Sequence, residues 1–130
     1  MAGAARPRVL LADDHPALLK ALRRLLQPAC DVVGEVAVGT AVVDAAQQLM
    51  PDVVVLDLAM PELNGLEACC QITNATPLTR VVILTATDDP DVRQRAIEMG
   101  AFAFVLKQFA STELPDAIER AMRDSPARHL

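Results

Sequence analysis

The sequence has 130 residues, of which 52% are hydrophobic and 22% charged, a composition typical of one folded globular domain. Its 17 acidic and 12 basic residues give a formal net charge of −5. This balance argues against a nucleic-acid-binding surface, because phosphate contacts need clustered Lys and Arg. No apolar run approaches the roughly 20 residues of a membrane span, and residues 1–7 lack the apolar core of a signal peptide.

The three cysteines, Cys30, Cys69 and Cys70, are odd in number and lack the spacing of metal ligands. We therefore expect reduced, packed thiols in a cytoplasmic protein that makes no membrane contact. Residues 1–7 are expected to form a disordered N-terminal segment. Residues 8–123 would form one domain, and residues 124–130 the start of a linker or tail.

Strand and helix signals alternate five times along the chain, without internal repeats. The strand signals are short apolar runs rich in β-branched residues, and the helix signals are apolar residues spaced three and four apart. Each predicted strand is followed by a predicted helix. The strands are expected at residues 9–12, 31–36, 53–57, 81–85 and 102–106.

Several residues indicate where the helices begin and end. Pro16 suits the first turn of the first helix, and Thr40 is expected to cap the second, which Pro51 stops. Gly100 is expected to close the fourth helix, and Pro115 to delay the start of the fifth, because proline lacks a backbone donor. The inward helix faces are expected to carry Leu18, Leu22, Leu25 and Leu26; Val43, Ala46, Leu49 and Met50; Val92, Ala96 and Met99; and Leu114, Ala117, Ile118, Ala121 and Met122.

The five alternating units predict an α/β fold of the (βα)5 type, doubly wound around a five-stranded parallel sheet. Right-handed crossovers between parallel strands place helices on both faces of such a sheet. The pattern alone does not set the strand order. The flavodoxin-like order 2-1-3-4-5 would place strands 9–12 and 53–57 side by side and make 31–36 an edge strand. An edge position suits the polar residues Asp31 and Glu35.

Three aspartates stand at the ends of two predicted strands: the pair Asp13-Asp14 after 9–12, and Asp57 at the end of 53–57. If these strands are parallel neighbours, the three carboxylates gather at one edge of the sheet, where ligands bind in open α/β folds. Such crowded negative charge favours a bound cation.

Further motifs stand at or after the strand ends. In chain order the set is Asp13-Asp14, Asp57 with Met60-Pro61 and Asn64-Gly65 after it, Thr85-Ala86, and Phe104 three places before Lys107. With these motifs in this order, the chain resembles the receiver domain of two-component response regulators, from residue 8 to about residue 123. Residues 13–16 and 64–68 look most like the subfamily whose receivers precede a LuxR-type (NarL-type) helix-turn-helix.

The resemblance implies that Asp57 accepts a phosphoryl group from a phosphohistidine on a sensor histidine kinase, with Mg²⁺ as cofactor. Mg²⁺ prefers hard oxygen ligands, as carboxylates supply. By the family pattern, Asp14 and Asp57 would be direct ligands and Asp13 a ligand through water. The backbone carbonyl of Ala59 would complete the protein's share of the ligands.

By the same resemblance, Lys107 brings positive charge to the phosphoryl oxygens and Thr85 donates its hydroxyl to another. The Thr85 hydroxyl would then be drawn inward, with Phe104 rotating into the vacated space. The face made by the fourth helix, fifth strand and fifth helix would be remodelled and control dimerisation or an output domain. Because Phe104 lacks the hydroxyl of the commoner Tyr, we predict an inward bias of its ring even without phosphate.

Under this interpretation the chain is a phosphoacceptor signalling domain of a transcription regulator, not an enzyme. It would contact DNA only through a C-terminal helix-turn-helix domain that this sequence does not contain. Many receivers have proline after the lysine, whereas this chain has Gln108, which leaves the conformation of that peptide bond open. His15 is expected to be structural, at the start of a helix.

Three alternatives would change the function, and the first of them keeps the receiver fold. A pseudo-receiver would bind partners without phosphorylation. An Mg²⁺-dependent phosphatase with an Asp nucleophile would want a second Asp two residues after it, where this chain has Ala59. A flavodoxin-like cofactor binder would want a phosphate-cradling loop after the first strand, where residues 13–16 would instead repel phosphate.

Overall fold

The computed structural model describes residues 6–60 and 63–124. Strands and α-helices alternate strictly along the described chain, with short 3₁₀ turns before the second and fifth α-helices. The elements are β1 (Arg8–Ala12), α1 (Pro16–Leu26), β2 (Asp31–Val36), η1 (Gly39–Ala41), α2 (Val42–Leu49), β3 (Val53–Asp57), α3 (Gly65–Ala75), β4 (Arg80–Thr85), α4 (Pro90–Glu98), β5 (Ala103–Leu106), η2 (Lys107–Phe109) and α5 (Ala110–Arg123).

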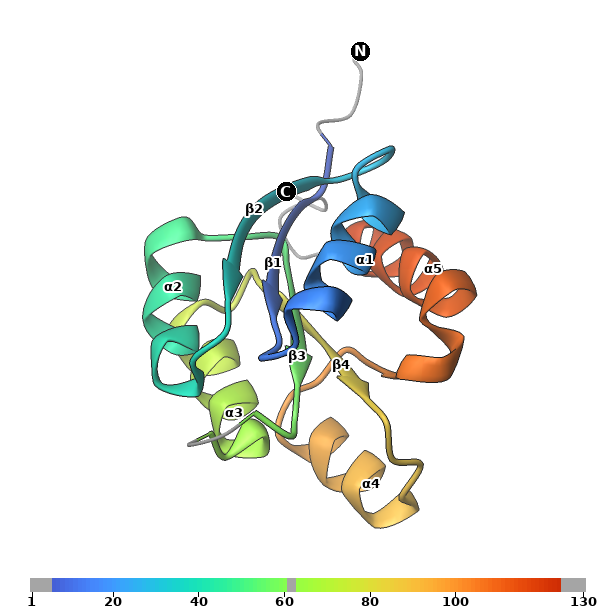
Figure 1. Ribbon diagram of the computed structural model, residues 1–130. Helices are drawn as coiled ribbons and strands as arrows, with labels where there is room; N and C mark the ends of the chain where they lie inside the picture. Colours follow the sequence, from blue (N-terminus) through green and yellow to red (C-terminus); the bar gives the residue numbers. More distant parts are fainter. Residues whose placement is uncertain (1–5, 61–62, 125–130) are drawn as a thin grey trace.

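The five strands form one parallel sheet in the order β2-β1-β3-β4-β5. Helices α1 and α5 lie on one face of the sheet, and α2 and α3 lie on the other (Figure 1). This arrangement confirms the predicted doubly wound fold and its strand order. It also confirms that Asp31–Val36 is an edge strand, since β2 pairs only with β1 among the described strands.

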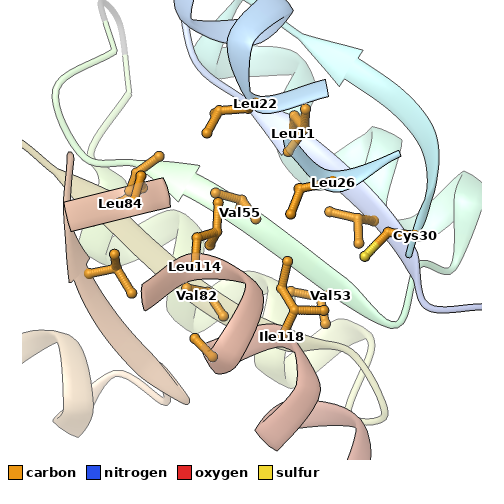
Figure 2. Packing of buried hydrophobic residues seen from close by; sticks show 14 of the residues in the cluster. Leu11, Leu22, Leu26, Cys30, Val53, Val55, Val82, Leu84, Leu114 and Ile118 are labelled. Carbon is orange, nitrogen blue, oxygen red and sulfur yellow. The ribbon is translucent and has the colours of Figure 1, made fainter. Parts of the chain in front are cut away.

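The core consists of two clusters, one on each face of the sheet. Alternate residues of a strand point to opposite faces, so β3 sends Val53 and Val55 to one cluster and Val54 and Leu56 to the other. Figure 2 shows the first cluster, in which side chains of the central strands pack against α1 and α5. Burial on both faces holds the central strands rigidly and fixes where their carboxyl ends lie.

The second helix differs from the prediction at both ends. Thr40 lies within the 3₁₀ turn η1 and caps nothing; α2 begins two residues later, without a side-chain cap. This shift makes Val42 and Ala46 the fully buried residues of α2. Met50 is 53% exposed, with a left-handed φ of 47°. The following Pro51 disfavours the helical conformation at residue 50, so the chain leaves the helix there.

Pro115 does not delay the last helix, contrary to prediction. It lies inside α5, which begins at Ala110. Proline costs this helix one hydrogen bond, to the carbonyl of Ser111. Burial of Ala110 and Leu114 on the sheet stabilises the first turns and overrides that loss.

The remaining helix faces agree with the prediction, apart from small shifts. On α1, Leu19 is fully buried in place of Leu18 and Leu25, which are half-buried. Val92, Met99 and Met122 are likewise half-buried at the edges of their helices. Gly100 follows α4 with a left-handed φ of 102°, the helix-closing conformation that was predicted. The fully buried predicted residues are Leu22, Leu26, Ala46, Ala96, Leu114, Ala117, Ile118 and Ala121.

Candidate functional site

Strand pairing brings the three aspartates together. In the β1–β3 register Ala12 lies opposite Leu56, so the next residues, Asp13 and Asp57, emerge side by side at the carboxyl edge of the sheet. Asp13 is 2% exposed and Asp57 1%. One carboxylate oxygen from each aspartate, with a ring nitrogen of His15, forms a group of four atoms within 4.8 Å of one another.

Lys107 brings the balancing positive charge to this cluster from the end of β5. Its Nζ lies 3.0 Å from Asp13 Oδ2 and donates a hydrogen bond to Asp57 Oδ2 at 3.3 Å. Burial would lower the pKa of Lys107, but the contact with Asp13 and the charge of Asp57 raise it above its ordinary value. The ammonium is therefore charged throughout the neutral range.

The same surroundings act on Asp13 in the opposite sense. Burial alone would raise its pKa, but a hydrogen bond from the His15 backbone and the nearby Lys107 ammonium together outweigh burial. The pKa of Asp13 therefore lies below its ordinary value. At neutral pH this buried side chain is a carboxylate, as a cation ligand must be.

His15 takes part in the cluster, which sequence reasoning missed. Its Nδ1 lies 2.9 Å from Asp13 Oδ1 and 3.1 Å from Asp14 Oδ1, and its backbone N–H donates to Asp13 Oδ1 at 2.8 Å. The residue does precede the first helix, as predicted, but its ring turns back to the carboxylates. The signal in the sequence was its position directly after the Asp13-Asp14 pair.

The loop after β3 holds Asp57 from the other side. The backbone N–H of Ala59 donates to Asp57 Oδ1 at 3.0 Å, which fixes the carboxylate against its own loop. Asn64 then begins α3 as a cap, because its side chain accepts a hydrogen bond from the Glu67 N–H at 3.1 Å. Pro61, part of the predicted motif in this loop, lies outside the described residues, together with residue 62.

Gly65 is required by close packing against this loop. A Cβ atom at this position would lie 2.8 Å from the Leu58 Cα, closer than real side chains approach a backbone. The first turn of α3 therefore rests directly on the residue that follows Asp57. The Asn-Gly pair is thus explained by a helix cap followed by a close backbone contact.

Thr85 and Phe104 lie on β4 and β5, the two strands that follow β3 in the sheet. Thr85 ends β4, is 6% exposed, and accepts a hydrogen bond from the Thr87 N–H at 3.3 Å, within its own loop. Phe104 is half-buried and packs against the cluster on the α2 and α3 face. Its predicted inward bias stays a prediction.

No peptide bond among the described residues is cis, so the bond between Lys107 and Gln108 is trans.

The donors at this site suit a magnesium ion. Asp13 Oδ2 and Asp14 Oδ1 are buried oxygens, and among the described residues each has a single basic neighbour, the Lys107 ammonium at 3.0 Å and the His15 ring at 3.1 Å. Carboxylate oxygens are the hard ligands that Mg²⁺ prefers. Asp57 adds a third carboxylate at the same edge.

A sequence profile of the family described as response regulator receiver domain matches residues 9–119. The chain belongs to this family. Receiver domains are signalling domains that generally bind Mg²⁺ at an acidic pocket. The family assignment confirms the resemblance seen in the sequence.

Relatives support the predicted subfamily. The chain is 37% identical over 121 residues to the transcriptional regulatory protein LiaR of Bacillus subtilis, and the match covers 92% of this chain but 57% of LiaR. The receiver domain of the putative response regulator NarL from Mycobacterium tuberculosis has a TM-score of 0.86 at 31% identity, with 93% and 99% of the two chains covered. A LuxR-family response regulator from Aurantimonas sp. SI85-9A1 has a TM-score of 0.85 at 32% identity, covering 95% and 92%.

The chain thus spans a little over half of the length of LiaR. Within residues 6–60 and 63–124, none of the helices is both long and apolar enough to cross a membrane.

Proposed function

We propose that Asp57 of this receiver domain is the acceptor of a phosphoryl group from a phosphohistidine on a sensor histidine kinase. The observation that carries the proposal is the convergence of Asp57 with two further carboxylates and Lys107 at the carboxyl edge of the sheet. A buried carboxylate beside a fixed ammonium is suited to attack phosphorus. Phosphoryl transfer depends mainly on such positioning and on charge stabilisation.

In the proposed step an Asp57 oxygen attacks phosphorus, the phosphorus–nitrogen bond to the kinase histidine breaks, and an acyl phosphate forms. Lys107, already 3.3 Å from Asp57 Oδ2, would stabilise negative charge on the phosphoryl oxygens. The Ala59 N–H keeps Asp57 Oδ1 in place at 3.0 Å. Mg²⁺ held by Asp13, Asp14, Asp57 and the carbonyl of Ala59 would supply further neutralising charge.

The proposed output is a change in the face made by α4, β5 and α5. The Thr85 hydroxyl, which now accepts a hydrogen bond within its own loop, would turn to a phosphoryl oxygen. Phe104 would follow into the vacated space. The phosphoryl group shifts this equilibrium only through contacts that differ between the two states. The remodelled face would control homodimerisation or an output domain.

The relatives extend this proposal to the whole protein. LiaR is named a transcriptional regulatory protein, and the chain spans 57% of its length. We infer that residues 8–123 serve as the receiver of a transcription regulator, with residues 124–130 leading towards a DNA-binding helix-turn-helix domain. The chain would act in the cytoplasm, where kinases that use ATP load their histidines.

Mass spectrometry after incubation with acetyl phosphate and Mg²⁺ tests the proposal. The wild-type protein should gain one phosphoryl group, and Asp57→Asn should gain none. Continuous release of phosphate from unrelated phosphate esters would favour a phosphatase instead. Absence of both an adduct and Mg²⁺ binding would overturn the proposal in favour of a pseudo-receiver.

A further inference from the structure

The guanidinium of Arg93 on α4 stacks over the ring of Phe104 on β5. The Arg93 Cζ lies 4.8 Å from the ring centroid, within the range of a cation–π interaction. The same guanidinium forms an ion pair with Asp88 in the β4–α4 loop, with Nη2 3.7 Å from Oδ1. One side chain therefore joins a loop, a helix and the strand that carries the proposed switch residue.

Helix α4 has little else to hold it against the sheet. Ala96 is its one fully buried residue, whereas Val92 is half-buried and Ile97 is 54% exposed. A helix with few buried apolar contacts shifts position at low free-energy cost. The contact between Arg93 and Phe104 is therefore one of the contacts that fix α4 relative to β5.

The chemistry of residue 104 makes this contact specific. A phenylalanine offers no hydroxyl to a hydrogen bond, so the polar interaction open to its ring is attraction of a cation to the electron-rich face. The loop that carries Asp88 also carries Thr87. The backbone N–H of Thr87 donates a hydrogen bond to the Thr85 hydroxyl oxygen at 3.3 Å. Arg93 thus connects the loop holding Thr85 to the ring expected to respond to it.

We propose that Arg93 is a positioning residue that holds Phe104 in the location seen here and so opposes the activating rotation of the ring, against the inward bias predicted for it. This inference rests on the proposed phosphorylation of Asp57, which it deepens by naming what resists the switch. A cation–π contact at a half-exposed site should lower the equilibrium constant for the activating rotation of Phe104 by about two- to fivefold. Arg93 touches neither the phosphoacceptor nor the metal donors among the described contacts, so any effect on the site passes through its contacts with Phe104 and Asp88.

The aromatic NMR spectrum reports this contact directly. The chain has three phenylalanines and no tyrosine or tryptophan, so its three ring systems can be assigned separately. In Arg93→Gln the Phe104 ring signals should move, and Arg93→Lys, which keeps the charge, should restore part of the shift. The matched control is Arg95→Gln on the same helix, because Arg95 makes no ion pair or aromatic contact among the described residues. It should leave the Phe104 signals unchanged.

The functional arm measures the affinity for beryllofluoride, a phosphoryl analogue, in the presence of Mg²⁺. Arg93→Gln should bind it about two- to fivefold more tightly than wild type, and Arg95→Gln should match wild type. In a Phe104→Leu background the effect of Arg93→Gln should disappear, which a merely structural role of Arg93 would not produce.

Two results would overturn the proposal. The Phe104 ring signals could stay unchanged in Arg93→Gln, or Arg93→Gln could raise the beryllofluoride affinity by the same factor in the Phe104→Leu background. Failure of the proposed function has a different signature. A wild-type protein that binds no beryllofluoride and accepts no phosphoryl group would refute both, even with the Phe104 signals responding to Arg93→Gln.

Discussion

Lys107 donates a hydrogen bond to Asp57 at 3.3 Å, although the two residues lie 50 positions apart in the sequence. Each stands where a parallel strand ends, Asp57 at β3 and Lys107 just after β5. The sheet therefore delivers a single ammonium to a cluster of carboxylates that would otherwise repel one another. The electrostatics of the site depend on this pairing.

Replacing Lys107 should destabilise the metal-free protein. Lys107→Met leaves Asp13 and Asp57 buried without their cation, a change that typically costs about 3 kcal/mol or more. The 20% exposure of the Lys107 side chain reduces the expected loss to about 2–3 kcal/mol. Urea unfolding in EDTA measures this loss. Added Mg²⁺ should recover more stability in the variant than in wild type.

Lys20→Met is the matched control, since Lys20 is exposed on α1 and should change the free energy of unfolding by less than about 0.5 kcal/mol. A Lys107→Met protein as stable as wild type in EDTA would show that the carboxylates do not need this cation.

Removing one carboxylate should weaken magnesium binding. We expect Asp14→Ala to bind Mg²⁺ at least about tenfold more weakly, because loss of a charged ligand exceeds the effect of losing a supporting contact. Binding to the native state raises the melting temperature, so the Mg²⁺-dependent shift should shrink accordingly. Asp44→Ala, at an exposed position on α2, should keep the full shift. An undiminished shift in Asp14→Ala would place the ion elsewhere.

Gly65→Ala should disturb the loop that holds Asp57. The new Cβ would lie 2.8 Å from the Leu58 Cα, so either α3 or the loop must move. We expect lower stability and shifted amide signals for Leu58 and Ala59, measured by denaturant unfolding and NMR. Asn64→Ala should cost about 1 kcal/mol through loss of the cap while leaving those two signals nearly in place. Unchanged signals in Gly65→Ala would contradict the close contact.

The cysteines should differ sharply in reactivity. Burial raises the pKa of the Cys69 thiol to about 12, with a smaller contribution from Cys70, and burial also raises the pKa of Cys30. Both thiols therefore stay protonated and unreactive at pH 8, since the thiolate is the reactive form. Brief treatment with iodoacetamide should label Cys70, which is half-buried, before the other two. Equal labelling of all three in the native protein would refute this expectation.

Much of the site could be predicted because strand ends are readable in the sequence. Strand 53–57 was predicted with its observed bounds, since its short, β-branched apolar run has no helical or alternating pattern to compete. Parallel pairing then converts strand ends into spatial neighbours. Together with the strand order 2-1-3-4-5, which the pattern alone does not set, that rule places Asp13, Asp57, Thr85 and Lys107 at one edge of the sheet.

The errors lie where tertiary contacts override local preference. Pro115 opposes a helix locally, but burial of its neighbours on the sheet keeps α5 continuous. Thr40 has the side chain of a cap, yet a 3₁₀ turn moves the helix start past it. His15 was assigned to a helix start alone, because its position beside Asp13 and Asp14 does not by itself show that the ring turns back to their carboxylates. Arg93 gave no local signal at all, since Phe104 approaches it from another element.

The central claim is that Asp57 carries the phosphoryl group, and the most direct test locates that group. After incubation with acetyl phosphate and Mg²⁺, borohydride reduces an aspartyl phosphate to homoserine, which peptide mass spectrometry identifies by position. We predict homoserine at residue 57 in wild type and at no position in Asp57→Asn. Homoserine at Asp13 or Asp14, or a phosphorylated protein without homoserine at residue 57, would contradict the account.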